Sequence, residues 1–144
     1  MHPFIHGNWA HLISNTAGFL VLGGLVIMRE PRDFWTVSLL AVVVGGAGIW
    51  LLGRSGPHVG ASGVVFGYFG YLLLTGVFDR RVGAILISVV TFLVWGRLLL
   101  GLSPLQQGIS WEGHLFGLVG GGAGAWLRGR QSSFSARGRT GRAP

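Results

Sequence analysis

The sequence predicts an all-α protein, a polytopic bundle of membrane helices. Half of its 144 residues are hydrophobic and only 10% are charged, whereas about a quarter of the residues in soluble domains carry charge. The hydrophobic residues are gathered in runs that approach the roughly 20 residues a spanning helix needs. Five spans are expected, over residues 10–28, 34–53, 62–78, 82–102 and 113–127.

The first two expected spans are bounded by prolines, because the interior of a helix disfavours proline. Pro31 separates the first span from the second, and Pro57 separates the second from the third. Trp35 and Trp50 lie at the two ends of the second span, where amphipathic rings would lie at the level of the lipid headgroups. Ordinary packing would explain each tryptophan equally well.

The third expected span begins at Ser62 and ends before Asp79, and Pro104 follows the fourth, which carries no motif of its own. The fifth span is the least apolar, because five glycines lie between positions 117 and 124. A Gly-rich helix of this kind is expected inside a bundle, away from lipid.

The distribution of arginine predicts the orientation in the membrane. Nine of the eleven basic residues would lie on one side of a five-span topology: Arg29, Arg32, Arg80, Arg81, Arg128, Arg130, Arg137, Arg139 and Arg142. The other two are Arg54 and Arg97. Because cytoplasmic loops retain positive charge, the first span is expected to start outside and the carboxyl end to be cytoplasmic. An odd number of spans without a signal peptide indicates that a preceding helix is missing from the sequence.

Residues 1–128 are expected to form the membrane domain, and residues 129–144 a disordered, basic cytoplasmic tail rich in Arg, Ser and Gly. The tail could bind anionic lipid headgroups or serve only to set the topology. Nucleic-acid binding is not expected, because Phe134 alone does not supply a base-stacking surface.

The composition also argues against metal and thiol chemistry. The chain has no cysteine, which excludes disulfides, thiol catalysis and thiolate metal sites. His6 and His11 are five residues apart and so lie on different faces of a helix, and no carboxylate accompanies His2, His6 and His11. No metal or other cofactor is therefore expected.

Four polar side chains from three spans are expected to lie at one depth. At ~1.5 Å per residue, Asn15, Ser62 and His114 lie roughly 21, 25 and 21 Å above the inner ends of their spans. His11 lies one turn above Asn15 on the same helix face. One such residue could simply form an interhelical hydrogen bond, but polar groups within spans usually face the bundle interior for a functional reason. Four at a shared depth favour a site just below the outer surface.

Three segments resemble motifs of the rhomboid family of intramembrane serine proteases. Residues 6–15 (HGNWAHLISN) resemble the second-helix motif, residues 60–63 (GASG) the nucleophile motif, and residues 113–121 (GHLFGLVGG) the last core helix. The order, spacing and topology agree over most of residues 2–127. Since the family core has six helices, the resemblance implies a rhomboid-like bundle in which five of the six are present and the first is absent.

The resemblance implies a catalytic dyad. His114 would remove the proton from Ser62 and later donate it to the leaving amine. Oxyanion binding is assigned to the side chains of His11 and Asn15 and to the backbone N–H of Ser62. Glu112 is only two residues from the base and so on another helical face, which disfavours a triad.

Something other than a carboxylate must then orient the imidazole. Phe66 lies one turn below the nucleophile and matches a position where the family often has tyrosine, so its ring could stack on His114. Close approach of the two helices is expected from small residues at four-residue spacing. These are Gly63 and Gly67 on one helix and Gly117 and Gly121 on the other. Packing alone would explain the glycines, but not the serine and the histidine.

The implied function is that of an intramembrane serine endopeptidase in a bacterial plasma membrane. Its partners would be the lipid bilayer and transmembrane protein substrates, which would enter between the first and fourth spans, with residues 82–102 as gate and 103–111 as cap. One alternative is a non-catalytic rhomboid-like protein that binds transmembrane clients. Another is a transporter, whose polar groups would lie near the midplane in two related halves, but no internal repeat is visible in the sequence.

Overall fold

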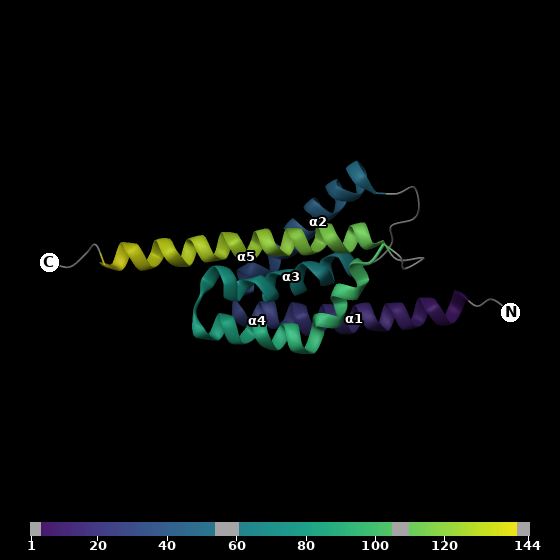
Figure 1. The fold of residues 1–144 in the computed structure, drawn as a ribbon, viewed down its shortest axis with the longest axis horizontal. Coiled ribbons are helices and arrows are strands. Elements are labelled where there is room, and N and C mark those ends of the chain that lie inside the picture. The colour runs from purple at the N-terminus through teal and green to yellow at the C-terminus, as the bar shows by residue number, and fades with distance from the viewer. Residues whose placement is uncertain (1–3, 54–60, 105–109, 141–144) are drawn as a thin grey trace.

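The computed structural model describes residues 4–53, 61–104 and 110–140, and all regular secondary structure within these residues is helical (Figure 1). The elements are α1 (Phe4–Arg29), α2 (Pro31–Leu52), α3 (Ser62–Asp79), α4 (Val82–Trp95), the 3₁₀ helix η1 (Gly96–Leu102) and α5 (Trp111–Thr140). The predicted all-α membrane bundle is confirmed.

Four segments are long and apolar enough to cross a membrane: His11–Arg29, Pro31–Leu52, Ser62–Asp79 and Val82–Leu102. They correspond to the first four expected spans. The fifth expected span lies within α5, which does not reach the same apolarity because glycines replace large side chains. Figure 1 shows α5 running alongside α3, where it contacts other helices.

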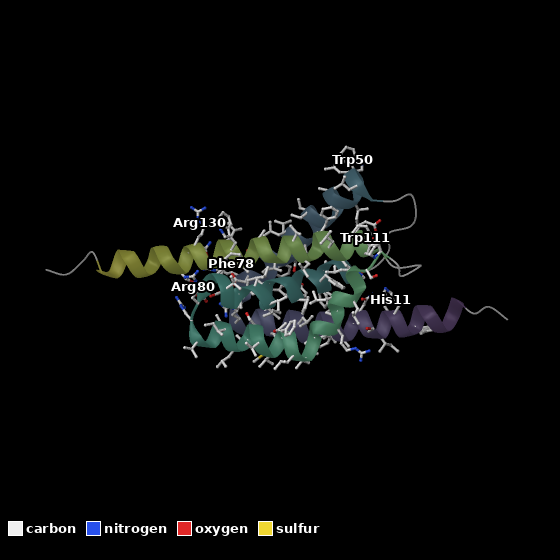
Figure 2. All side chains as sticks on the ribbon, in the orientation of Figure 1. His11, Trp50, Phe78, Arg80, Trp111 and Arg130 are labelled. Atoms are coloured by element: carbon white, nitrogen blue, oxygen red, sulfur yellow. The ribbon has the colours of Figure 1, made fainter. Side chains whose placement is uncertain are left out.

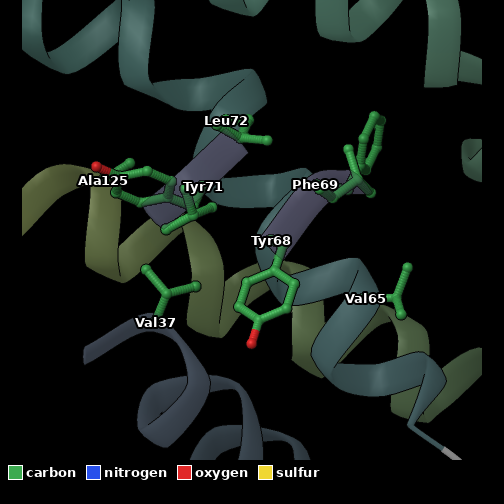
Figure 3. Close-up of a cluster of buried hydrophobic side chains, with 9 residues drawn as sticks. Val37, Val65, Tyr68, Phe69, Tyr71, Leu72 and Ala125 are labelled. Atoms are coloured by element: carbon green, nitrogen blue, oxygen red, sulfur yellow. The ribbon is translucent and has the colours of Figure 1, made fainter. Parts of the chain in front are cut away.

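Helix α3 is the centre of the bundle and contacts α1, α2, α4 and α5. Half of its 18 residues are buried, and Tyr68, Phe69, Tyr71 and Leu72 are fully enclosed. Figure 3 shows this cluster with Val37 of α2 and Ala125 of α5 packed around it. Large apolar side chains on the outer faces, such as Trp50 and Leu93, are exposed instead, as helices in contact with lipid require.

Helix α4 lies at the edge of the bundle, and only 6% of the span Val82–Leu102 is buried. It is attached to α3 through Ser88. The hydroxyl of Ser88 donates to the Leu72 carbonyl at 2.9 Å and accepts from the Gly76 N–H at 2.8 Å. These are two groups that pair with each other in a regular helix, so α4 is anchored to the backbone of its neighbour.

Glycines allow α3 and α5 to pack at backbone distance. A β-carbon at Gly117 would overlap the carbonyl group of Gly63, and one at Gly121 would overlap that of Gly67. The sequence assigns these four glycines to helix approach, and in the structure they face one another. Close packing of the two backbones carries the start of α5 to the start of α3.

Charged side chains join four helices at the end of the bundle away from Ser62. Arg29 of α1 pairs with Asp79 of α3 at 2.5 Å, Tyr71 donates to Asp33 of α2, and Arg128 of α5 lies 3.2 Å from Glu30 and 3.6 Å from Asp33. We call this set the distal cluster: Arg29, Glu30, Asp33, Tyr71, Asp79 and Arg128. The sequence places several of these residues at helix ends but does not predict that they pair.

Helix α5 continues to Thr140 and differs there from the disordered tail expected from residue 129 onward. Once a helix has formed, each added residue contributes one hydrogen bond without a new nucleation cost. Residues 129–140 contain no proline, and their arginines, glutamine and alanine are good helix formers, although two glycines and three serines accompany them. The disordered tail was expected from the composition of residues 129–144 alone, which ignores that the preceding helix can extend into this segment. Residues 141–144 lie outside the described part of the chain.

Candidate active site

Ser62 and His114 are both near the beginnings of their helices. Ser62 is the first residue of α3, and the carbonyl of Ala61 before it accepts from the N–H groups of Val64 and Val65. His114 lies in the first turn of α5, where its N–H bonds to the Ser110 carbonyl. The first N–H groups of a helix have no acceptor within the helix, so the N–H of Ser62 has no acceptor within α3.

A cavity of about 310 Å³ opens at this end of the bundle. Residues of α1, α3, α4, η1 and α5 line it, among them His11, Asn15, Ser62, Phe66 and His114. The structure thus brings together the four polar residues that the sequence predicts to share one depth, and the predicted stacking ring with them. Figure 2 shows His11 of α1 and Trp111 of α5 at the same end, with Arg80 and Arg130 at the opposite end.

The imidazole of His114 is buried and is held on two sides. Its ring is stacked on Phe66, with 4.0 Å between the centroids and 6° between the planes. Its Nδ1 lies 2.9 Å from the carbonyl oxygen of Gly101. A carbonyl can only accept a hydrogen bond, so Nδ1 carries the proton and, in the neutral ring, Nε2 is left as an acceptor. The ring is thereby prepared to receive a proton at Nε2.

The Gly101 carbonyl is the orienting group that sequence reasoning missed. Gly101 belongs to η1, and a β-carbon there would lie 3.1 Å from Cζ of Phe66 and 3.2 Å from Nδ1 of His114. A glycine is therefore favoured at this position. A backbone carbonyl leaves no trace in side-chain patterns, and the glycine itself was the available signal.

Ser62 also borders a second, smaller cavity of about 150 Å³ between α2, α3 and α5. Gly45 and Gly46 of α2, together with Ser110 and Gly113 near the start of α5, contribute to its walls. The serine therefore stands between two cavities. No hydrogen bond joins it to His114 in this state, although both residues are described. Catalytic hydrogen bonds of this kind are often long in a free enzyme and shorten when substrate binds.

The other residues considered from the sequence lie apart from this cavity or outside the described part. Glu112 is buried in the first turn of α5, and the acceptor for Nδ1 of His114 is the Gly101 carbonyl rather than a carboxylate. His2 and the side chain of His6 lie outside the described residues. Among the described residues, no group of three His, Asp or Glu side chains is placed to hold a metal ion.

Comparison with known proteins gives one family and several relatives. The family described as "Rhomboid domain" matches residues 1–131. An uncharacterized protein of Mycobacterium tuberculosis is 40% identical over 134 residues, which cover 87% of this chain and 56% of the relative. The putative rhomboid protease YdcA of Bacillus subtilis is 29% identical over 81% of this chain and 59% of the relative.

A plant protein is also similar over a shorter region. Rhomboid-like protein 11, chloroplastic, of Arabidopsis thaliana is 40% identical over 49% of this chain and 26% of the relative. The chain spans a little over half the length of the mycobacterial relatives it matches. No solved structure matches the chain.

Proposed function

The chain belongs to the rhomboid family, and on this premise we propose that it is an intramembrane serine endopeptidase that cleaves transmembrane segments of other membrane proteins. One observation carries the proposal: Ser62, His114, His11 and Asn15 line a single cavity at one end of a bundle of membrane helices. That set supplies a nucleophile, a base and hydrogen-bond donors for an oxyanion. The transmembrane location of the substrate is inferred from the family.

The proposed reaction begins at Ser62. Nε2 of His114 accepts the Ser62 hydroxyl proton while Oγ attacks the scissile carbonyl carbon, which gives a tetrahedral oxyanion. The imidazolium then donates that proton to the leaving amine as the C–N bond breaks. Water, deprotonated by the same imidazole, hydrolyses the acyl-enzyme and restores the serine.

The groups around His114 suit a ring that becomes positively charged. The Gly101 carbonyl, 2.9 Å from Nδ1, directs the negative end of its dipole at the imidazolium. The face of Phe66, stacked at 4.0 Å, carries a negative quadrupole that also favours a cation. These two contacts take the place of the carboxylate that orients histidine in a triad.

The oxyanion would be held by donors from two helices. Asn15 and His11 contribute side chains from α1, and Ser62 contributes its N–H at the start of α3, where the helix dipole adds favourable potential. These donors belong to separate helices, so all of them contact the oxyanion only when the scissile carbonyl lies between α1 and α3.

We place substrate entry between α1 and α4. The span Val82–Leu102 is 6% buried, the lowest value among the four spans. Displacing α4 would therefore break fewer contacts than displacing another span, and a transmembrane segment could then reach the cavity. A substrate helix must also unwind, since its hydrogen-bonded carbonyls are hidden from the nucleophile.

The proposed orientation follows from charge. Exposed Arg80 and Arg130 lie at the end opposite His11 (Figure 2), and exposed Arg32 is next to Asp33 of the distal cluster. Cytoplasmic segments retain positive charge. We therefore propose a bacterial plasma-membrane protein with a cytoplasmic carboxyl end and a cavity near the outer surface. Bacterial relatives support the bacterial location.

Labelling with a phosphonate that reacts with activated serines tests the function. We expect the purified protein to be labelled, and labelling to be lost in Ser62→Ala and reduced at least about 100-fold in His114→Ala, because an unassisted hydroxyl is a weak nucleophile at neutral pH. Ser14, which also lines the cavity, provides the matched control, and Ser14→Ala should still be labelled.

Two results would contradict the proposal. Labelling that survives Ser62→Ala would place the reactive serine elsewhere, and labelling that is indifferent to His114→Ala would remove the base. Complete absence of labelling in the folded protein would favour the other function considered, a non-catalytic rhomboid-like protein that binds transmembrane clients.

A further inference from the structure

Arg97 lines the same cavity as Ser62 and His114. It is the second residue of η1, the short helix whose Gly101 carbonyl holds the imidazole. Its side chain is exposed. The proposed reaction assigns no role to the positive charge of Arg97. Only one other arginine, Arg54, is expected on this side of the membrane.

Arg97 has no anionic partner among the described residues. The chain has four acidic residues: Glu30, Asp33, Asp79 and Glu112. The first three lie in the distal cluster, each within 4.0 Å of an arginine there. No described carboxylate lies within 4.0 Å of Arg97, and no hydrogen bond to a described residue holds its guanidinium. No described residue therefore occupies its five N–H donors.

The position of Arg97 along η1 gives its approximate distance from the reacting groups. At ~2.0 Å per residue, Arg97 lies about 8 Å along the 3₁₀ helix from Gly101, the residue that contacts the base. An extended peptide covers about 3.3 Å per residue. The same separation on a bound substrate corresponds to about two or three residues.

We infer that Arg97 is a specificity-determining residue that binds an acidic side chain of the substrate about two or three residues from the scissile bond. The inference rests on the proposed protease function. A planar guanidinium matches a carboxylate with two parallel hydrogen bonds. The same charge disfavours substrates with Lys or Arg at that position, so selection acts in both directions.

A phosphate of an outer-leaflet lipid is the competing anion. The cavity favours the substrate, because Arg97 lines it together with the groups that would contact the peptide. An ion pair within a partly enclosed cavity is also less screened than one at the headgroup surface.

Binding to Ser62→Ala protein tests the inference without requiring catalysis. The protein is reconstituted in nanodiscs of phosphatidylcholine with a minor fraction of phosphatidylglycerol. It is titrated with fluorescent transmembrane peptides that carry Asp, Asn or Lys at successive positions on each side of a candidate cleavage site. At one or two of these positions we expect the Asp peptide to bind about 10-fold more tightly than the Asn peptide, as one charge-assisted contact would give.

Substitutions at Arg97 identify the group responsible. In the Ser62→Ala background, Arg97→Gln should reduce the Asp/Asn ratio to about one, Arg97→Lys should retain part of it, and Arg97→Glu should make the Lys peptide the tighter binder. Arg80→Gln, an exposed arginine at the opposite end, is the matched control and should leave the ratio unchanged.

Three outcomes would overturn the inference. These are equal binding of Asp and Asn peptides at every position, a preference that survives Arg97→Gln, and a loss on Arg97→Gln of bound phosphatidylglycerol with no effect on peptide selection. The last would assign the guanidinium to lipid. Because binding is measured with the serine removed, these outcomes are separate from a failure of phosphonate labelling, which would contradict the protease function itself.

Discussion

His114 owes its position to a neighbouring ring and a backbone carbonyl. Phe66 was expected from the sequence as the stacking ring, and the two rings are nearly parallel. The Gly101 carbonyl determines which nitrogen carries the proton. Its effect is the one that a carboxylate has in a triad, because it leaves Nε2 as the acceptor, but it adds no formal charge.

At the residue scale, Gly101→Ala should impair the proposed reaction. The new methyl group would lie 3.1 Å from the Phe66 ring and 3.2 Å from Nδ1 of His114, so these two stacked rings must shift by a few tenths of an ångström. A displacement of that kind should reduce the rate of phosphonate labelling about 10- to 100-fold.

Gly96→Ala is the matched control for this prediction. Gly96 belongs to the same 3₁₀ helix, and a methyl group there would meet its nearest neighbour, the Phe92 ring, at an ordinary 3.6 Å. Labelling of Gly96→Ala should stay within about twofold of the unmutated protein. Equal rates for the two variants would show that the Gly101 contact does not orient the base.

At the element scale, the glycine-lined contact of α3 with α5 brings Ser62 and His114 to the same cavity. Ser62 begins one of these helices and His114 lies in the first turn of the other. The glycines also explain why α5 is less apolar than the other spans: a helix that packs against a neighbour's backbone needs small residues. The glycines thus explain both the low hydropathy of α5 and its close packing against α3.

Gly121→Ala should separate α3 from α5. Its methyl group would overlap the Gly67 carbonyl, and neither backbone can yield locally. Overpacking of this kind costs about 1–3 kcal/mol. We expect that loss in the free energy of unfolding, measured in detergent, together with a loss of phosphonate labelling in the fraction that remains folded.

Gly122→Ala, one residue further along α5, provides the comparison. Its methyl group would meet only a terminal methyl of Leu74, which can rotate away, and alanine favours a helix over glycine by about 1 kcal/mol. Its stability should equal or exceed that of the unmutated protein. A similar loss in both variants would indicate a general intolerance of side chains in α5, not a specific contact.

At the scale of the whole molecule, polar functions are divided between the two ends of the bundle. One end holds the cavity with Ser62 and His114, and the other holds the distal cluster. The distal cluster joins α1, α2, α3 and α5, which lie apart in the sequence. It therefore stabilises the assembly of helices without using any residue of the proposed reaction.

Asp79→Ala should destabilise the bundle while leaving the cavity intact. The Asp79 side chain is 4% exposed and pairs with Arg29, which is 12% exposed. Removing the carboxylate leaves the part-buried Arg29 with only the Tyr71 hydroxyl as a partner among the described residues, and breaking a buried pair in this way costs about 3–5 kcal/mol. Unfolding in detergent should report a loss of that order, and labelling below the unfolding transition should persist, because the cluster is at the far end.

A double variant separates pairing from packing. Arg29→Leu with Asp79→Leu removes both charges, so it should be less destabilised than the sum of the two single variants. Arg32→Gln, an exposed arginine at the same end, should change stability by no more than about 0.5 kcal/mol. Additive effects of the two leucine substitutions would argue that the pair contributes nothing as a pair.

The sequence was sufficient for the membrane class, four of the spans and the family. Long apolar runs have no stable alternative to spanning helices, so their length alone predicts them. The match to the rhomboid family over residues 1–131 confirms the resemblance that three short motifs carried. The catalytic roles of Ser62 and His114 stay a prediction, now with a cavity that holds both residues.

Other features depended on contacts between segments distant in the chain. The Gly101 carbonyl on His114, the pairing of Asp33 with Tyr71 and the position of Arg97 in the lining of the cavity have no local signature. Every residue has a carbonyl, and any arginine can be paired or free. The sequence by itself determined which segments are helices and which residues can do chemistry, whereas only the tertiary structure decided which groups those residues face, because facing depends on how the helices pack.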